Sequence, residues 1–146
     1  SPIEAFAGPI GYQATIARGR ADAPRVVLAT GKVGVELAAR GLTEDVRLIL
    51  VERLYPFPES ELREELMRPG IDEVVWLQEE PENMGAWRFI SHELLRRRLV
   101  HRRFGYIGGV EASSPAEGYA TDHALVHERV LTEATQRGIA DEWLLD

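Results

Sequence analysis

The stretch that decides the fold runs from residue 73 to residue 87 and reads EVVWLQEEPENMGAW. Its first part, Glu73 to Gln78, is an apolar run with the length of a buried strand. Its second part is polar, contains Pro81 and reaches Gly85, where a helical pattern begins and continues to Leu99. The stretch therefore predicts a buried strand, a polar connection and a helix.

The same unit of strand, turn and helix is repeated along the chain. Its apolar runs do not alternate cleanly with polar residues, which is typical of strands covered by helices on both faces of a parallel sheet. We therefore predict an α/β fold: a doubly wound, mostly parallel sheet of about five strands with helices on both faces. Further strands are expected at residues 25–30, 46–52 and 103–107, a turn at 31–34, and further helices at 35–40, 59–68 and 121–136.

The beginning of the chain differs from the rest because glycine and proline interrupt it and no period is sustained. We interpret residues 1–24 as an irregular arm or linker from a preceding domain that the sequence lacks. Residues 25–146 are then one α/β domain. The chain has 146 residues, 45% of them apolar, which is enough to bury a core.

Composition excludes several classes of function. The chain has no cysteine, so disulfides and thiol chemistry are excluded. Its net charge of −7 repels a phosphate backbone, and its apolar runs are far shorter than the ~20 residues that span a bilayer. We therefore expect neither nucleic acid nor a membrane as a partner.

The turn at residues 31–34 holds Lys32, which is the only lysine in the chain, between two glycines. At the start of a helix, this residue has the position for an anion contact, although a bare turn is the alternative. The spacing is neither a dinucleotide fingerprint nor a P-loop. Lys32, Arg53 and the basic cluster at residues 96–103 motivate a second functional hypothesis, a regulatory module that binds a small molecule near one sheet edge.

The polar connection carries two adjacent carboxylates, Glu79 and Glu80, which suggest acid–base chemistry by residue type. Neighbouring side chains of a strand point to opposite faces, so the two carboxylates need not meet. The structural alternative assigns Asn83 to cap the following helix, Gly85 to allow the approach of a partner chain, and Trp87 to face a partner surface. We favour a rigid strand-to-helix connector.

Three other motifs have mainly structural interpretations. The YPFP motif at residues 55–58 predicts a rigid turn that seats Tyr55 and Phe57 in a neighbouring core or an interface. The basic cluster at residues 96–103 suits a solvated helix end, with a phosphate-bearing ligand or an acidic subunit as the alternative. His123 and His127 have the spacing of metal ligands on a helix, but no third ligand is evident, so no metal site is predicted.

Taken in order, the motifs resemble a known family. The string from Trp76 to Trp87, containing Gln78-Glu79-Glu80-Pro81, Asn83 and Gly85-Ala86-Trp87, is similar to the carboxy-terminal domain of 2-oxoglutarate dehydrogenase decarboxylating components. These enzymes are thiamine-diphosphate-dependent, and their last domain is transketolase-like. The resemblance covers about residues 25 to 135. The remaining motifs alone fit transketolases and other 2-oxo acid dehydrogenases equally well.

The resemblance implies a function. The family oxidatively decarboxylates 2-oxoglutarate in the tricarboxylic acid cycle and transfers the succinyl group to the lipoyl acyltransferase of a multienzyme complex. Thiamine diphosphate and Mg²⁺ are then held by the preceding domains of a homodimer, so this fragment is expected to hold no cofactor and to be inactive alone. Its partners would be those domains, the homodimer partner and dihydrolipoyl succinyltransferase, in the bacterial cytoplasm or, in a eukaryote, the mitochondrial matrix.

Some members of the family also bind a nucleotide or acetyl-CoA regulator through arginines of this domain. The present sequence departs from that pattern at Leu50 and Gly109, where those relatives often have arginine, while Arg53 replaces their usual glutamine. One relocated guanidinium does not restore a two-point phosphate clamp.

Overall fold

The computed structural model describes residues 13–81, 83–100, 103–109, 130–132, 134–135 and 142–145. Residues 130–132 and 134–135 are helical. The other elements follow in chain order as β1 (Thr15–Gly19), β2 (Arg25–Ala29), α2 (Gly31–Arg40), β3 (Val46–Val51), α3 (Glu59–Leu66), β4 (Glu73–Pro81), α4 (Trp87–Arg96), β5 (Arg103–Gly109) and β6 (Glu142–Leu145).

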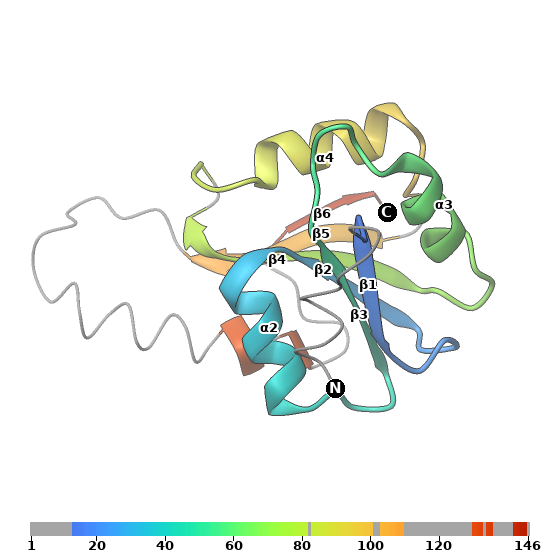
Figure 1. Cartoon of the computed structure of the whole chain (residues 1–146), viewed down its shortest axis with the longest axis vertical. Helices are drawn as coiled ribbons and strands as arrows, with labels where there is room; N and C mark the ends of the chain where they lie inside the picture. Colours follow the sequence, from blue (N-terminus) through green and yellow to red (C-terminus); the bar gives the residue numbers. More distant parts are fainter. Residues whose placement is uncertain are drawn as a thin grey trace, which may run out of the picture.

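The strands form one sheet in the order β1-β3-β2-β4-β5-β6 (Figure 1). The four inner strands are parallel to one another. At the two edges, β1 pairs antiparallel with β3 and β6 pairs antiparallel with β5. The α/β fold with a mostly parallel sheet is therefore confirmed, with six strands among the described residues where about five were expected.

Both edge strands were missed by the sequence analysis. Residues 15–19, expected to be part of an irregular arm, form β1, and that part of the expectation was wrong. An edge strand has one neighbour and buries little, so a short one leaves no sustained apolar pattern: only Ile16 of β1 is buried. The origin of residues 1–24 in a preceding domain stays a prediction.

Several element boundaries also differ from the expected ones. Helix α2 begins at Gly31, so the expected turn at residues 31–34 is its first turn. Strand β4 continues to Pro81, and α4 begins at Trp87 where Gly85 was expected. Of the helix expected at residues 121–136, the two described parts are helical, whereas His123 and His127 lie outside the described residues.

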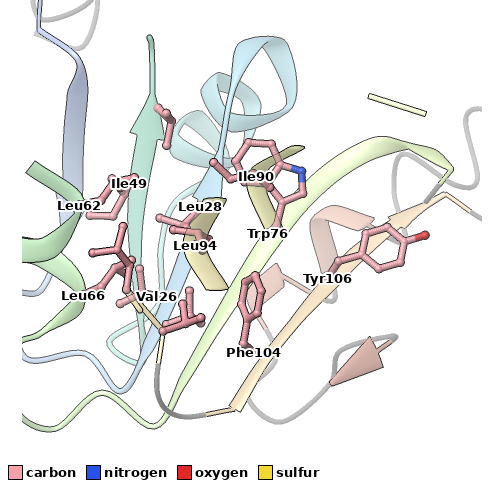
Figure 2. Close-up of a cluster of buried hydrophobic side chains, with 14 of the residues drawn as sticks. Val26, Leu28, Ile49, Leu62, Leu66, Trp76, Ile90, Leu94, Phe104 and Tyr106 are labelled. Carbon is pink, nitrogen blue, oxygen red and sulfur yellow. The ribbon is translucent and has the colours of Figure 1, made fainter. Parts of the chain in front are cut away.

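The core has two layers, one on each face of the sheet. One layer lies under α3 and α4, where Leu66 and Ile90 from these helices meet Leu28, Trp76 and other side chains of the parallel strands (Figure 2). The other layer lies under α2 and the helical residues 130–132 and 134–135. Helices therefore cover both faces, as the unalternating strand sequences predicted.

Close packing brings α2 onto its face of the sheet. Gly34 is buried, and a Cβ atom at this position would overlap the Leu50 side chain of β3. Glycine at residue 34 thus lets the helix backbone lie directly over the strand. None of the described helices is long and apolar enough to cross a membrane.

Candidate functional site

The connector, residues 78–86, comprises the carboxyl end of β4 and the segment that leads into α4; residue 82 lies outside the described residues. In parallel sheets this edge is where ligands and partners usually bind. The amide of Gln78 lies at its centre and is 3% exposed. Its Oε1 atom accepts hydrogen bonds from the indole Nε1 of Trp76 at 2.9 Å and from the backbone N–H of Trp87 at 3.1 Å.

The nitrogen of the same amide binds the connector backbone. Gln78 Nε2 donates toward the carbonyl oxygens of Glu80 at 3.1 Å, Pro81 at 2.9 Å and Met84 at 2.9 Å. One buried side chain thus joins the core, the connector and the helix start. Fully satisfied polar groups of this kind specify a unique backbone path.

The predicted helix cap was wrong. The N-cap residue of α4 is Ala86, and no side chain makes the usual capping bond from that position, so Asn83 does not cap the helix. Asn83 is exposed. The first backbone N–H of α4 is instead bound by Gln78 Oε1, which arrives from the preceding strand.

Gly85 is required by the shape of the connector. Its φ of 69° lies in the left-handed region that glycine adopts without strain. A Cβ atom there would lie 3.0 Å from Gln78 Oε1 and 3.2 Å from Glu80 Cδ. The close approach expected of a partner chain is therefore made by the chain's own Gln78 and Glu80.

Trp87 packs in the core, and the expectation that it faces a partner surface was wrong. Its side chain is 3% exposed. The ring stacks on Tyr106 with centroids 5.2 Å apart and lies 5.4 Å from Phe104. Trp76 is fully buried in the same layer, so both tryptophans of the motif are structural.

The two adjacent carboxylates have different surroundings. Glu80 is exposed and lies on the same side of β4 as Gln78, since both contact the Gly85 position. Glu79 is partly buried, and the alternation of a strand turns it toward the other face. Pro81 ends the strand, and its carbonyl accepts from Met84 N at 2.9 Å. The geometry does not favour a catalytic dyad.

The two predicted anion contacts lie in separate surroundings. Lys32 is in the first turn of α2, with its side chain 82% exposed and 3.6 Å from Glu36. Arg53 follows β3 and donates through Nε to the carbonyl of Pro56 at 3.1 Å. In the described structure Lys32 and Arg53 share no hydrogen-bond or ion-pair partner. Their binding of an anion stays a prediction.

An open hollow of about 720 Å³ lies beside Arg53, between Phe57 and the first two turns of α3. Arg53 NH2 lies 3.8 Å from Glu61 Oε2 across it. The charged lining is three glutamates and two arginines, Glu59, Glu61, Glu64, Arg53 and Arg63. With acids in excess, this hollow does not attract a phosphate.

The basic cluster is largely paired within the chain, which agrees with a structural role for this helix end. Arg96 donates to Glu93 at 3.0 Å, and Arg97 donates to Glu93 at 2.9 Å and also to Glu59 of α3. We call these residues, with Arg63, the α3–α4 ion-pair network. His101 and Arg102 lie outside the described residues.

These arginines change the acidity of their partners. Hydrogen bonds from Arg63 first, and then from Arg97, hold the pKa of Glu59 below its usual range. Hydrogen bonds from Arg96 first, and then from Arg97, lower the pKa of Glu93 in the same way. The network is therefore ionised throughout the neutral range.

Aromatic rings from the YPFP turn rest on the same helix. Tyr55 and Phe57 have ring centroids 5.2 Å and 6.2 Å from that of Phe89. The Arg97 guanidinium lies 4.8 Å above the Phe57 ring. Phe57 is partly buried against the core, as predicted, whereas Tyr55 is 76% exposed.

The sequence analysis missed a buried ion pair at the amino-terminal ends of the central strands β2 and β4. Arg25 is 0% exposed and Glu73 is 1% exposed; Nε of the arginine lies 2.8 Å from Oε1 of the glutamate. Arg25 Nη1 also donates to the carbonyl of Ala134 at 3.0 Å, which ties the helical residues 134–135 to the sheet. The only sequence signal was a charged residue at the first position of each of two buried strands.

Comparisons with known proteins place the chain in a family. Residues 1–135 match the family described as 2-oxoglutarate dehydrogenase C-terminal. The chain is similar to the 2-oxoglutarate dehydrogenase E1 component of an Exiguobacterium species, with 38% identity over 95% of the chain and 16% of that protein. The E1 component of Shouchella clausii is 37% identical over 94% of the chain and 16% of its own length. That of a Staphylococcus aureus strain is 39% identical over 75% of the chain.

The chain thus spans 16% of the length of the first two relatives. The match extends over nearly the whole chain and includes the connector and every parallel strand. The chain therefore belongs to the 2-oxoglutarate dehydrogenase C-terminal family.

Proposed function

We propose that the chain acts as the non-catalytic carboxy-terminal domain of a 2-oxoglutarate dehydrogenase E1 component, in dimerisation and assembly of the enzyme. The observation that carries this proposal is the Gln78 amide. Gln78, the first residue of the Gln-Glu-Glu-Pro string, is directed inward and binds Trp76, the connector carbonyls and the start of α4. A motif whose side chain hydrogen bonds to the backbone of its own chain is consistent with a structural role for the domain.

The cofactors are assigned to the rest of the enzyme. Thiamine diphosphate requires a divalent ion, and among the described residues there is no group of three His, Cys, Asp or Glu side chains that fits one. Glu79 and Glu80, the acids of the motif, point to opposite sides of β4. On this proposal, neither acid takes part in a catalytic step.

The partners follow from the proposed place in the enzyme. They are the preceding domains, the second subunit of a homodimer and dihydrolipoyl succinyltransferase. The relatives named above are E1 components of bacteria, so the proposed location is the bacterial cytoplasm. The transketolase-like character of the fold is part of the same proposal.

A direct test compares three proteins: the 146-residue chain, the Exiguobacterium relative without its aligned stretch, and that relative with this chain in place of the stretch. Decarboxylation of 2-oxoglutarate is measured with thiamine diphosphate, Mg²⁺ and an artificial electron acceptor, and subunit number by sedimentation. We expect turnover and a dimer from the chimera alone. Turnover by the isolated chain, or an unchanged dimer without the stretch, would reject the proposal.

A regulatory role receives less support from the described charges. The hollow beside Arg53 has more acids than bases, and Leu50, where regulated relatives often have arginine, is fully buried in the core. We expect titration of the chain with millimolar AMP or acetyl-CoA in a calorimeter to give no binding heat. Saturable heat that Arg53→Ala or Lys32→Ala removes would favour the regulatory module.

A further inference from the structure

Two exposed apolar side chains lie beside the first turn of α4. Tyr55 and Met84, exposed by 76% and 56%, are the most exposed large apolar residues of the described structure. Tyr55 comes from the loop after β3 and its ring contacts Phe89 of α4. Met84 comes from the connector, three residues before the helix begins. With Arg88 they form what we call the α4 docking surface.

The backbone beneath Met84 is held on both sides. Its N–H donates to the carbonyl of Pro81 at 2.9 Å, and its own carbonyl accepts from Gln78 Nε2 at 2.9 Å. Because this backbone is already fixed, a partner that covers Met84 has to order its side chain but not the connector. This part of the connector is thus preorganised for contact, although the motif itself faces inward.

Arg88 adds a charge to the same surface. It is exposed in the first turn of α4, a turn that contains no acidic residue. Cations are disfavoured at this end of a helix because the amino-terminal pole is positive. In the described structure Arg88 makes no ion pair. A carboxylate from a partner would therefore offset the unfavourable interaction between its charge and the positive helix pole.

We propose that the α4 docking surface packs against the portion of the E1 component that precedes this domain, in an apolar recess that also presents an acidic residue to Arg88. The inference rests on the proposed function. The chain covers 16% of its relatives' length and its family is the carboxy-terminal one, so most of the remaining enzyme lies on its amino-terminal side. The sheet edge that bears the surface is the one where α/β domains usually meet partners.

The chain's methionines provide the test. It has two, Met84 on the surface and Met67, 38% exposed at the end of α3. Hydrogen peroxide oxidises exposed methionine to the sulfoxide, which peptide mass spectrometry counts for each residue. We compare the isolated chain with the chimera in which it replaces the aligned stretch of the Exiguobacterium E1 component.

We expect both methionines to be oxidised in the isolated chain, and only Met67 to be oxidised readily in the chimera. Covering Met84 should slow its oxidation roughly tenfold, because the reaction needs access to solvent. Arg88→Glu in the chimera should restore much of that oxidation, whereas Arg98→Glu, an exposed arginine beyond the other end of α4, should not. Where the chimera is insoluble, adding the chain in trans to the truncated relative gives the same comparison.

Equal oxidation of Met84 in both proteins would overturn the docking surface. Protection that appears in the isolated chain as its concentration rises would overturn it too, because the occupant would then be a second copy of the domain. The chimera's turnover of 2-oxoglutarate separates this inference from the proposed function. An active dimeric chimera with an unprotected Met84 rejects the surface and leaves the function standing.

Discussion

Replacing Gln78 by leucine should strongly destabilise the domain. The substitution keeps the approximate size of the side chain but leaves two donors without acceptors, the indole N–H of Trp76 and the backbone N–H of Trp87, in residues that are 0% and 3% exposed. A buried donor left unsatisfied costs about 1–3 kcal/mol. The three carbonyls bound by Nε2 are nearer to solvent, and leucine gains about 1 kcal/mol of apolar burial. The net loss is therefore about 3 kcal/mol.

That loss converts into a measurable shift of the melting temperature. Unfolding entropy of ~2.1 cal/mol/K per residue gives ~0.3 kcal/mol/K for a chain of this length, so 3 kcal/mol lowers Tm by about 10 °C. The assay is thermal and urea unfolding followed by near-ultraviolet circular dichroism. Gln13→Leu, the same substitution at an exposed glutamine, is the control and should change stability by less than ~0.5 kcal/mol.

A second substitution separates the hydrogen bonds from general packing. Trp76→Phe removes the indole N–H that Gln78→Leu leaves unsatisfied. The double variant should therefore be more stable than the sum of the single losses predicts, by about 1 kcal/mol. A Tm within about 2 °C of the wild type for Gln78→Leu, less than 1 kcal/mol for this size of chain, would refute the reasoning.

Three further substitutions test other contacts. Gly85→Ala and Gly31→Ala impose the same backbone strain, since φ is 69° and 68°, but only residue 85 has atoms close to an added Cβ; Gly85→Ala should cost about 1–2 kcal/mol more in urea unfolding. Glu73→Leu should cost about 3–5 kcal/mol because Arg25 is left as a buried charge, and adding Arg25→Leu should recover most of it. A double variant no better than the single one would contradict this. Arg97→Gln should lower stability at pH 7, and its deficit should shrink as the pH falls below the ordinary glutamate pKa of 4.5, because depressed glutamate pKa values stabilise the fold only while those groups are ionised. A deficit independent of pH from 7 to 3.5 would argue against this reading.

The parallel strands were predictable because they are buried on both faces. All five residues of β2 are buried, and after Arg25 the run has no polar position that another interpretation could use. The edge strands β1 and β6 escaped prediction for the converse reason. Each needs one neighbour, so its pairing depends on a surface that only the assembled sheet offers.

The sequence predicted the type of the candidate site, a rigid connector, but assigned the helix cap to the wrong residue. Its interpretation as a rigid connector agrees with the contacts of Gln78, but the cap was assigned to Asn83 because sequence rules look for it just before the helix. The acceptor came from a strand instead, at residue 78. Arg25 and Glu73 were out of reach, since they are 48 positions apart and only the parallel register aligns them.

Contacts of Gln78 differ from that buried pair in one further respect. Every hydrogen bond of its amide joins residues at most nine positions apart. The hydrogen bonds that fix the path from β4 to α4 thus lie within the string from Trp76 to Trp87, although Trp87 also packs against Phe104 and Tyr106 of β5. Such a segment can acquire its shape early in folding, before the non-local pairings of the sheet close. We expect the same string to form the same turn and the same helix start when it follows a buried parallel strand of an unrelated α/β protein.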